Sequence, residues 1–332
     1  MAEITYLEAG RLALAEAMRA DPDVWALGED LGRGGVFGQY KGLAEEFGPE
    51  RIADTPISEA CIMGAAVGAA MMGTRPVVEM RFSDFALCAV DELVNQAAKA
   101  RFMFGGQARV PMVARQPIGM WRSSAAQHSQ SLESWYTHVP GLVVITPSTP
   151  ADNFSLLQAA IRSDDPVVYM EHKNLWPLEG EVAVDKPRSG DPADEIGKAH
   201  VVRAGDDVTI VTWSAMVHEA ARAAAQVKAG DPGIAAEVID LRTLWPWDVE
   251  TVLASARKTG RLLVVHEAVQ VAGFGAEIAA TVADQAFADL RAPVKRLGAP
   301  RILIGYAPPL EHEVKITAER DIAPAIRALM EN

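Results

Sequence analysis

Short apolar runs alternate with amphipathic stretches along nearly the whole chain, and this alternation constrains the fold more than any other feature. The apolar runs occur at residues 24–27, 76–80, 110–114, 142–145 and 166–170. Helical patterns occur between them, near residues 7–18, 60–72, 82–104 and 152–162. Strands that are apolar on both faces are typical of a parallel sheet covered by helices on each side. We therefore predict an α/β fold built on parallel sheets.

The segment from about Lys173 to Gly197 interrupts the alternation and predicts a linker. It has little periodicity and is rich in turn-forming residues, namely Pro177, Gly180, Pro187, Gly190 and Pro192. Stretches of this composition commonly separate domains. Beyond it, apolar runs resume at residues 208–211, 235–239 and 262–265, each followed by a plausible helix. We expect a first domain at residues 1–175, a linker at 176–198, and a second α/β domain at 199–332.

Charge and cysteine content narrow the choice of partners and compartment. The chain has 31 Lys and Arg against 44 Asp and Glu, a net charge of −13, and no basic cluster, which disfavours nucleic acid as a partner. Cys61 and Cys88 are the only cysteines, so a disulfide framework is excluded and a reducing cytoplasm is expected. No signal peptide is recognisable at the N-terminus, and the longest low-charge run, Ala60 to Thr74, is too short to span a membrane.

The stretch Asp54–Glu59 (Asp-Thr-Pro-Ile-Ser-Glu) places a carboxylate where a strand passes into a helix. Pro56 cannot lie inside a central strand or a helix interior, and Ser58 is a favourable helix cap. Glu59 then falls in the first helical turn. Two interpretations stay open from the spacing alone. Glu59 either simply favours the positive end of the helix dipole or has a chemical function.

A second candidate region is the stretch Gln116 to Ser131, which has little helical or strand periodicity and contains His128. Long irregular segments inside a compact α/β domain are usually functional. A single loop histidine can equally be a solvated or capping residue. Phe82 and Phe85 flank a short turn after a strand, where they are either core residues or a stacking surface for a planar ring.

Several familiar motifs are absent. Gly32–Gly38 fails the dinucleotide fingerprint because Phe37 stands where the third glycine belongs. His218-Glu219 and His266-Glu267 lack the second histidine of a zinc-protease helix. Neither a phosphate-binding Gly-x-x-x-x-Gly-Lys-Ser/Thr loop nor a Gly-x-Ser-x-Gly elbow occurs.

An ordered series of motifs makes the chain resemble a known family. The series is Gly28–Asp30, Asp54–Glu59, Gly68–Ala70, Ala126–Ser129, Pro140–Leu142, Ala160–Arg162, Asp240–Thr243 and Ala272–Glu277. It resembles the beta subunit of the thiamine diphosphate-dependent E1 component of 2-oxo acid dehydrogenase complexes, over about Thr5 to Pro309. The resemblance implies a transketolase-like pyrimidine-binding domain followed by a transketolase C-terminal-like domain.

The resemblance also implies residue roles. Glu59 matches the glutamate that hydrogen-bonds N1′ of the cofactor's aminopyrimidine, so that the cofactor can lose its C2 proton and attack a substrate carbonyl. Phe85 matches the aromatic residue that stacks on this ring, and Glu29 and Ile57 match further cofactor-binding positions. His128 matches a histidine thought to steer the intermediate and the incoming lipoyl group.

The family's diphosphate and magnesium motif, which begins Gly-Asp-Gly, is missing. The chain has Gly190-Asp191-Pro192, Gly205-Asp206-Asp207 and Gly230-Asp231-Pro232 instead. The resemblance therefore implies that this chain holds only the pyrimidine half of the thiamine diphosphate site. An E1 alpha subunit would supply the diphosphate half with its Mg²⁺, in an α2β2 assembly, and a lipoylated E2 acyltransferase would receive the acyl group.

The family also binds a structural potassium ion before the strand that starts near Pro166. The matching positions are Met112, Ala160, Ile161, Ser163 and Asp165, largely through backbone carbonyls, and Ser163 departs from the usual aspartate. Without potassium, the same segment would be an ordinary helix-to-strand turn, and both interpretations stay open.

A further departure concerns the substrate. Trp121 and Arg122 interrupt a loop before Gln127 and His128 in which relatives often carry glycines. The stretches Gly34–Gly38 and Gln127–Glu133 resemble the acetoin-type branch of the family, so we expect acetoin or a related 2-oxo compound first and pyruvate second. Two alternatives remain: a transketolase-like or synthase-like subunit that needs no lipoyl partner, and a non-catalytic scaffold subunit. The presence of both Glu59 and His128 argues against the scaffold, which would need neither residue.

Overall fold

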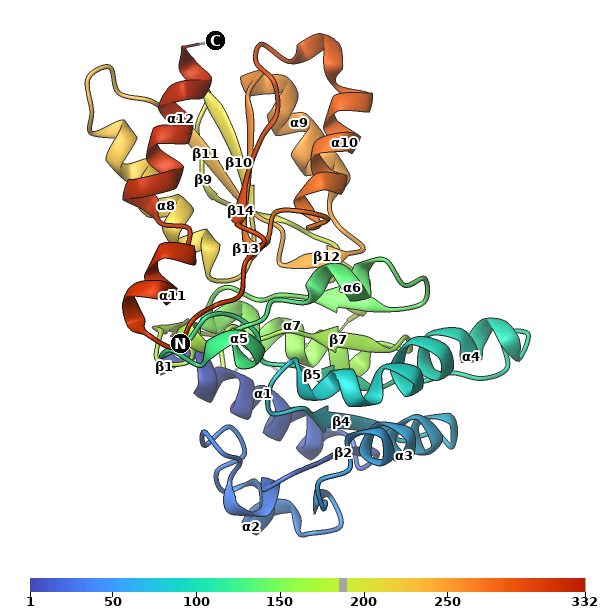
Figure 1. Ribbon diagram of the computed structural model, residues 1–332. Helices are drawn as coiled ribbons and strands as arrows, with labels where there is room; N and C mark the ends of the chain where they lie inside the picture. The colour runs from blue at the N-terminus through green and yellow to red at the C-terminus, as the bar shows by residue number, and fades with distance from the viewer. Residues whose placement is uncertain (185–189, 332) are drawn as a thin grey trace. The chain divides into compact units, whose positions relative to one another are not determined.

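The computed structural model describes residues 1–184 and 190–331, which form two compact units (Figure 1). Unit 1 comprises Met1–Ile118 and Trp135–Ile196, and unit 2 comprises Gly119–Ser134 together with the chain from Gly197 onward. The expected linker includes residues 185–189, and the expected second domain ends at residue 332. These six positions lie outside the described residues.

Unit 1 is built on a parallel sheet, as the apolar runs predicted. Its strands lie in the order β6 (Val143–Ile145), β7 (Val167–Tyr169), β5 (Val113–Arg115), β4 (Arg75–Glu79), β2 (Val24–Gly28) and β3 (Ile52–Asp54). Every neighbouring pair is parallel. In register, Gly28 at the end of β2 lies opposite both Asp54 and Glu79, so three strands finish at one edge.

The helices of unit 1 begin where the sequence provides caps. Thr5 accepts a backbone hydrogen bond at the start of α1 (Tyr6–Ala20), and Thr149 does so for α7 (Pro150–Arg162), where Pro150 occupies the first turn. These two helices pack on each other and on the sheet, and their apolar faces form one core with β2, β4 and β7. The other α-helices of this region are α2 (Leu43–Phe47), α3 (Glu59–Met71) and α4 (Ala98–Met103), and α6 (Glu133–Thr137) belongs to unit 1 from Trp135 onward.

Two expectations for unit 1 need correction. The helix expected over residues 82–104 is broken into a 3-10 segment η2 (Phe85–Ala89), a π-helical segment η3 (Glu92–Ala97) and α4. The region expected to be linker contains β8 (Glu179–Val182), which pairs antiparallel with β1 (Ala2–Thr5), and the short 3-10 segments η4 (Lys173–Leu175) and η5 (Pro192–Asp194). A further 3-10 segment, η1 (Leu31–Arg33), follows β2.

Unit 2 is a second α/β layer structure. Its sheet order is β14 (Lys295–Ala299), β13 (Leu262–Val269), β10 (Val208–Thr212), β11 (Ala236–Asp240) and β9 (His200–Arg203). The pairs are parallel except that β9 runs antiparallel to β11 at one edge. The remaining elements are β12 (Thr243–Trp245), α5 (Ala125–His128), α8 (Met216–Lys228), α9 (Val249–Thr259), α10 (Gly275–Gln285), η6 (Phe287–Asp289), α11 (Pro308–Val314), η7 (Ala318–Ile322) and α12 (Ala323–Met330).

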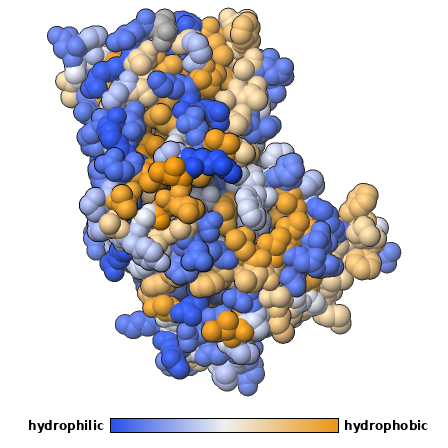
Figure 2. Space-filling view, viewed as in Figure 1, coloured by the Kyte–Doolittle hydropathy of each residue, from blue (hydrophilic) through white to orange (hydrophobic). Residues whose placement is uncertain are grey.

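The surface mixes hydrophilic residues with hydrophobic patches on both units, as the face in Figure 2 shows. Among the described residues, no helix has the length and apolar character that crossing a membrane requires.

Candidate active site

Glu59 lies at the turn from β3 into α3, as the Asp54–Glu59 stretch predicted. It is the first residue of α3 and is half-buried. The preceding turn is held by Asp54, whose Oδ1 accepts the backbone N–H of Gly32 at 2.8 Å. Ser58 occupies the cap position but does not cap with its side chain, because its hydroxyl donates to the carbonyl of Pro56 at 3.0 Å. The positive end of α3 is therefore open to the Glu59 carboxylate.

The expected cofactor residues other than Glu59 also lie near strand ends or turns of unit 1. Glu29 directly follows β2, and Arg81 Nη1 donates to its Oε2 at 3.1 Å. The same guanidinium lies 3.6 Å from a carboxylate oxygen of Asp30, which has a left-handed backbone (φ 60°). Ile57, in the turn before α3, has 76% of its surface exposed. The carboxyl edge of a parallel sheet is where α/β proteins bind ligands.

Phe85 belongs to a cluster of aromatic rings. It is half-buried, and its ring centre lies 5.8 Å from that of Phe82. Phe82 in turn lies 5.8 Å from Phe37, and Phe37 lies 4.6 Å from Trp176. The ammonium of the buried Lys173 lies 4.7 Å from the centre of the Phe82 ring. This cluster holds the η2 segment, and with it Phe85, against the loop that carries Phe37.

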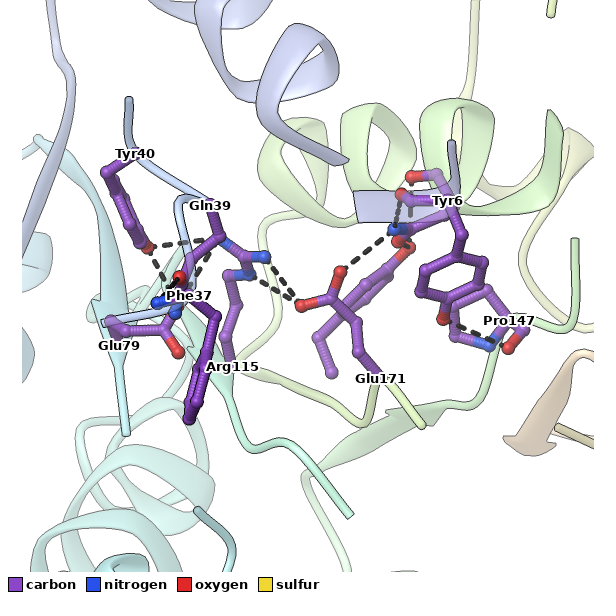
Figure 3. Close-up of polar contacts among 10 residues, drawn as sticks. Tyr6, Phe37, Gln39, Tyr40, Glu79, Arg115, Pro147 and Glu171 are labelled. Carbon is purple, nitrogen blue, oxygen red and sulfur yellow. Dashed lines mark hydrogen bonds and ion pairs between the residues drawn. The ribbon is translucent and has the colours of Figure 1, made fainter. Parts of the chain in front are cut away.

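A network of charged and hydroxyl groups is buried at the carboxyl ends of β4 and β5 (Figure 3). Tyr40 donates to Oε2 of Glu79 at 3.0 Å, and Arg115 Nη1 lies 3.3 Å from the same oxygen. On its other side, Arg115 donates through Nε and Nη2 to Oε2 of Glu171, at 3.1 and 2.6 Å. Burial raises the pKa of Glu79 to about 7, since the Arg115 charge offsets only part of the desolvation and Glu171 adds repulsion. The network joins the ends of β4 and β5 to the loop that contains Tyr40.

The irregular stretch around His128 packs with unit 2. The N–H of Met120 donates to Oε1 of Glu267 at 2.7 Å, and the N–H of Ser123 donates to Oε2 of Glu311 at 2.8 Å. Further along, Glu133 accepts from the indole N–H of Trp213 at 3.1 Å. These contacts fix a segment that has almost no regular structure of its own.

The loop before His128 has an unusual backbone. Arg122, Ser123 and Ala125 all have positive φ angles, of 49°, 57° and 62°. Such angles are uncommon in residues other than glycine, and they cluster at functional sites. The guanidinium of Arg122, whose side chain is exposed, lies 4.9 Å from the centre of the Trp121 ring.

His128 closes the short helix α5 and is half-buried, while the neighbouring Gln127 is exposed. The residues that follow, from Ser129 to Leu132, line a cavity of about 710 Å³ in unit 2. Its other walls come from the ends of β13 and β14 and from the apolar loop Ile302–Ile304. Two sets of expected site residues therefore belong to different units. Unit 1 contains Glu29, Ile57, Glu59 and Phe85, and unit 2 contains Trp121, Arg122, Gln127 and His128.

Several of the positions expected to bind potassium have carbonyl oxygens that accept hydrogen bonds. The carbonyls of Ile161 and Ser163 both accept hydrogen bonds from Arg75. The carbonyl of Met112 accepts from the N–H of Val167 at 2.9 Å. Two of the expected ligands therefore already accept hydrogen bonds from a guanidinium.

The comparisons with known proteins agree with the fold. Residues 2–179 match the family model of the transketolase pyrimidine-binding domain, and residues 197–320 match that of the transketolase C-terminal domain. The chain is 42% identical to the 2-oxoisovalerate dehydrogenase subunit beta of Bacillus subtilis, with 100% of each chain covered. It is 45% identical to the acetoin:2,6-dichlorophenolindophenol oxidoreductase subunit beta of Cupriavidus necator, over 96% of this chain and 95% of that protein.

The chain belongs to the family of thiamine diphosphate-dependent E1 beta subunits. Another member, the pyruvate dehydrogenase E1 component subunit beta of Rhizobium meliloti, is 42% identical over 99% of this chain and 70% of that protein. Among solved structures, a split-gene transketolase described as an inactive beta4 tetramer aligns with a TM-score of 0.79. It has 23% identity and covers 99% of this chain and 98% of that one, and the likeness supports the fold alone. The expected family and two-part α/β architecture are confirmed.

Several residues of the site region could not be found from the sequence. Phe37, Trp176 and Lys173 meet around Phe82, although Phe37 and Trp176 are far apart in the chain. Glu79, Arg115 and Glu171 each sit in or directly after an apolar run, which was the one available signal. A charged residue at a buried strand end needs a partner, but the sequence does not say which one.

Proposed function

We propose that this chain is the beta subunit of an E1 dehydrogenase that acts on acetoin or a 2-oxo acid. It would provide the pyrimidine half of the thiamine diphosphate site. The observation that carries the proposal is the position of Glu59 at the first turn of α3, beside the carboxyl edge of the unit 1 sheet. When bound, the cofactor supplies the carbon nucleophile that attacks the substrate carbonyl.

In this proposal, the carboxyl of Glu59 holds and exchanges a proton at N1′ of the aminopyrimidine. Phe85 offers a ring face to the same heterocycle, and the aromatic cluster behind it keeps the ring in place. Glu29 is oriented by its hydrogen bond from Arg81. Ile57 is exposed and would contribute apolar contact. In unit 2, His128 would move protons and guide the acyl acceptor, with Gln127, Trp121 and Arg122 shaping access.

The diphosphate and its Mg²⁺ would be held by an E1 alpha subunit, since this chain has no Gly-Asp-Gly motif. Exposed apolar residues support an assembled state. Helix α3 has no charged residue after Glu59, yet Cys61 and Ala65 on the helix and Met72 directly after it are exposed. A further exposed group, Phe102–Phe104, ends α4. Apolar surface of this extent usually marks contact with another protein.

The decisive experiment is reconstitution with the alpha subunit, followed by assays with an artificial electron acceptor on acetoin, pyruvate and branched-chain 2-oxo acids. We expect acetoin to give the highest kcat/KM and pyruvate the second highest. A second assay adds lipoylated E2 protein. Product transfer that requires E2 supports the dehydrogenase, whereas release without it favours a transketolase-like or synthase-like enzyme. No turnover on any substrate, with assembly intact, would support a scaffold.

A further inference from the structure

The turn between α7 and β7 is the part of unit 1 where the family's potassium ion is expected. Helix α7 ends at Arg162, so its last carbonyls have no partner within the helix. The negative end of the helix dipole adds to their need for a cation or a donor. The carbonyls of Ile161 and Ser163 belong to this end of the helix.

Arg75, the first residue of β4, supplies a cation to these carbonyls. Its Nη1 donates to the carbonyl of Ile161 at 3.1 Å and to that of Ser163 at 2.9 Å. Its Nη2 donates to Oδ1 of Asp164 at 2.9 Å, and its Nε lies 3.9 Å from Oδ2 of Asp21. One planar guanidinium therefore serves two helix-end carbonyls and a carboxylate at once.

Side-chain groups of Asp165 and Ser163 and the carbonyl of Ala160 also have hydrogen-bond partners. The carboxylate of Asp165 accepts from Arg101 Nη1 at 2.9 Å. The hydroxyl of Ser163 accepts the N–H of Asp165 at 3.2 Å, a local bond that closes the turn. The carbonyl of Ala160 accepts the N–H of Ser163 at 3.2 Å.

The charges around the turn balance without a metal ion. Asp21, Asp164 and Asp165 face the guanidinium groups of Arg75, Arg101 and Arg109. A potassium ion among the carbonyls of Ile161 and Ser163 would add a positive charge next to a fixed one.

We propose that the guanidinium of Arg75 is the resident cation of this turn, and that the chain folds and assembles without potassium. An ordinary helix-to-strand turn results, in which a side chain of this same chain performs the structural task of the ion. The inference concerns stability and does not depend on which substrate the enzyme uses.

The test is thermal unfolding of the full-length chain, in the assembly in which it is purified, in 100 mM KCl, NaCl or choline chloride. A potassium site with a dissociation constant of about 1 mM would raise the midpoint temperature of unfolding in KCl by about 5 °C relative to that in choline chloride. We expect the wild-type midpoints in the three salts to agree within about 1 °C. A saturable rise that is specific to KCl would overturn the proposal.

Arg75→Met supplies the second measurement, with Arg109→Met as its matched control. Both side chains pair with Asp164, but the contacts with the Ile161 and Ser163 carbonyls come from Arg75. Arg75→Met should unfold several degrees lower than Arg109→Met in choline chloride. If the two variants unfold at the same temperature, Arg75 is not the cation that stabilises this turn. Should Arg75→Met fail to fold, the wild-type salt comparison still decides the question.

Discussion

Glu79 and Arg115 lie directly opposite each other on the neighbouring parallel strands β4 and β5, and Arg115 Nη1 is 3.3 Å from Oε2 of Glu79. Neither side chain meets solvent. Arg115 also pairs with Glu171, so two buried carboxylates share one guanidinium. Because only one cation lies between them, ionising both buried carboxyl groups at once is costly.

The first prediction is that this shared arginine makes stability depend on pH. Burial raises the pKa of Glu79 to about 7, above its unfolded value, so the folded chain binds this proton more tightly. The resulting stabilisation is fully present below the unfolded pKa of 4.5 and is lost as pH rises from there through the folded pKa of about 7. Glu79→Gln keeps the shape and stays neutral at every pH. The free energy of unfolding of Glu79→Gln, measured relative to that of the wild type, should therefore rise by on the order of 2 kcal/mol from pH 5 to pH 8.

Urea unfolding at pH 5, 6, 7 and 8 measures this difference. Glu45→Gln, an exposed carboxylate on α2, is the control and should follow the wild type at each pH. Parallel stability curves for wild type and Glu79→Gln would show that Glu79 is ionised throughout and that its pKa is not raised.

A second prediction concerns the Gly273–Gly275 part of the Ala272–Glu277 motif. A Cβ added at Gly275 would lie 2.8 Å from Cδ2 and 2.9 Å from Nε2 of His266. His266 is fully buried and stacks on Trp213 with ring centres 5.3 Å apart, so moving its ring would disturb this stacking. Gly275→Ala should lower the free energy of unfolding by about 1–3 kcal/mol.

Gly68→Ala is the matched helical control, since a Cβ there meets no atom within 4 Å. In the interior of α3 it should be neutral or stabilise by up to about 1 kcal/mol. Equal unfolding free energies for the two variants would mean that the His266 pocket can relax and that the glycine has another purpose.

The third prediction is that Glu59→Gln abolishes turnover while the assembly stays intact. The amide can still hydrogen-bond, but it cannot exchange a proton at N1′. Loss of a positioned proton-transfer group typically costs about 10²–10⁴-fold in rate. Exchange of the cofactor's C2 proton, followed by NMR in the reconstituted enzyme, reports this step. Near-normal exchange would remove Glu59 from the proposed role.

A fourth prediction follows from the missing Gly-Asp-Gly motif. The isolated chain should bind thiamine diphosphate weakly by calorimetry, with no dependence on Mg²⁺, and addition of the alpha subunit should restore Mg²⁺-dependent binding. Tight Mg²⁺-dependent binding by this chain alone would contradict the half-site.

The sequence was sufficient for the features that depend on neighbouring residues. Continuous apolar runs located the parallel strands, and Asp54–Glu59 located the strand-to-helix turn, because both rest on local steric and packing rules. It was insufficient where distant segments meet. The Phe37–Trp176 contact, the shared guanidinium of Arg115 and the packing of residues 119–134 with unit 2 depend on tertiary structure. The broken helix after Phe82 shows the same limit, since its apolar pattern looked regular while its backbone contains a π-helical segment.

The last prediction concerns Trp121 and Arg122, which we expect to set substrate choice. Arg122 has a left-handed backbone and its guanidinium covers the Trp121 ring. Glycine adopts the left-handed backbone of Arg122 without strain, so this replacement should leave folding intact, and both residues can be replaced with Gly together. If the pair lines the substrate path, the double variant should change the ranking of acetoin, pyruvate and branched-chain 2-oxo acids by kcat/KM. Loss of a buried apolar contact changes discrimination by about 10–200-fold.

The single variants Trp121→Gly and Arg122→Gly separate the contribution of the ring to substrate ranking from that of the charge. Because the two side chains contact each other, their effects should not be additive. The alternative role is an anchor for the alpha subunit, for which Trp and Arg are both well suited. An unchanged substrate ranking with weaker association of the alpha subunit, measured by titration, would reject the specificity role and establish the anchor instead.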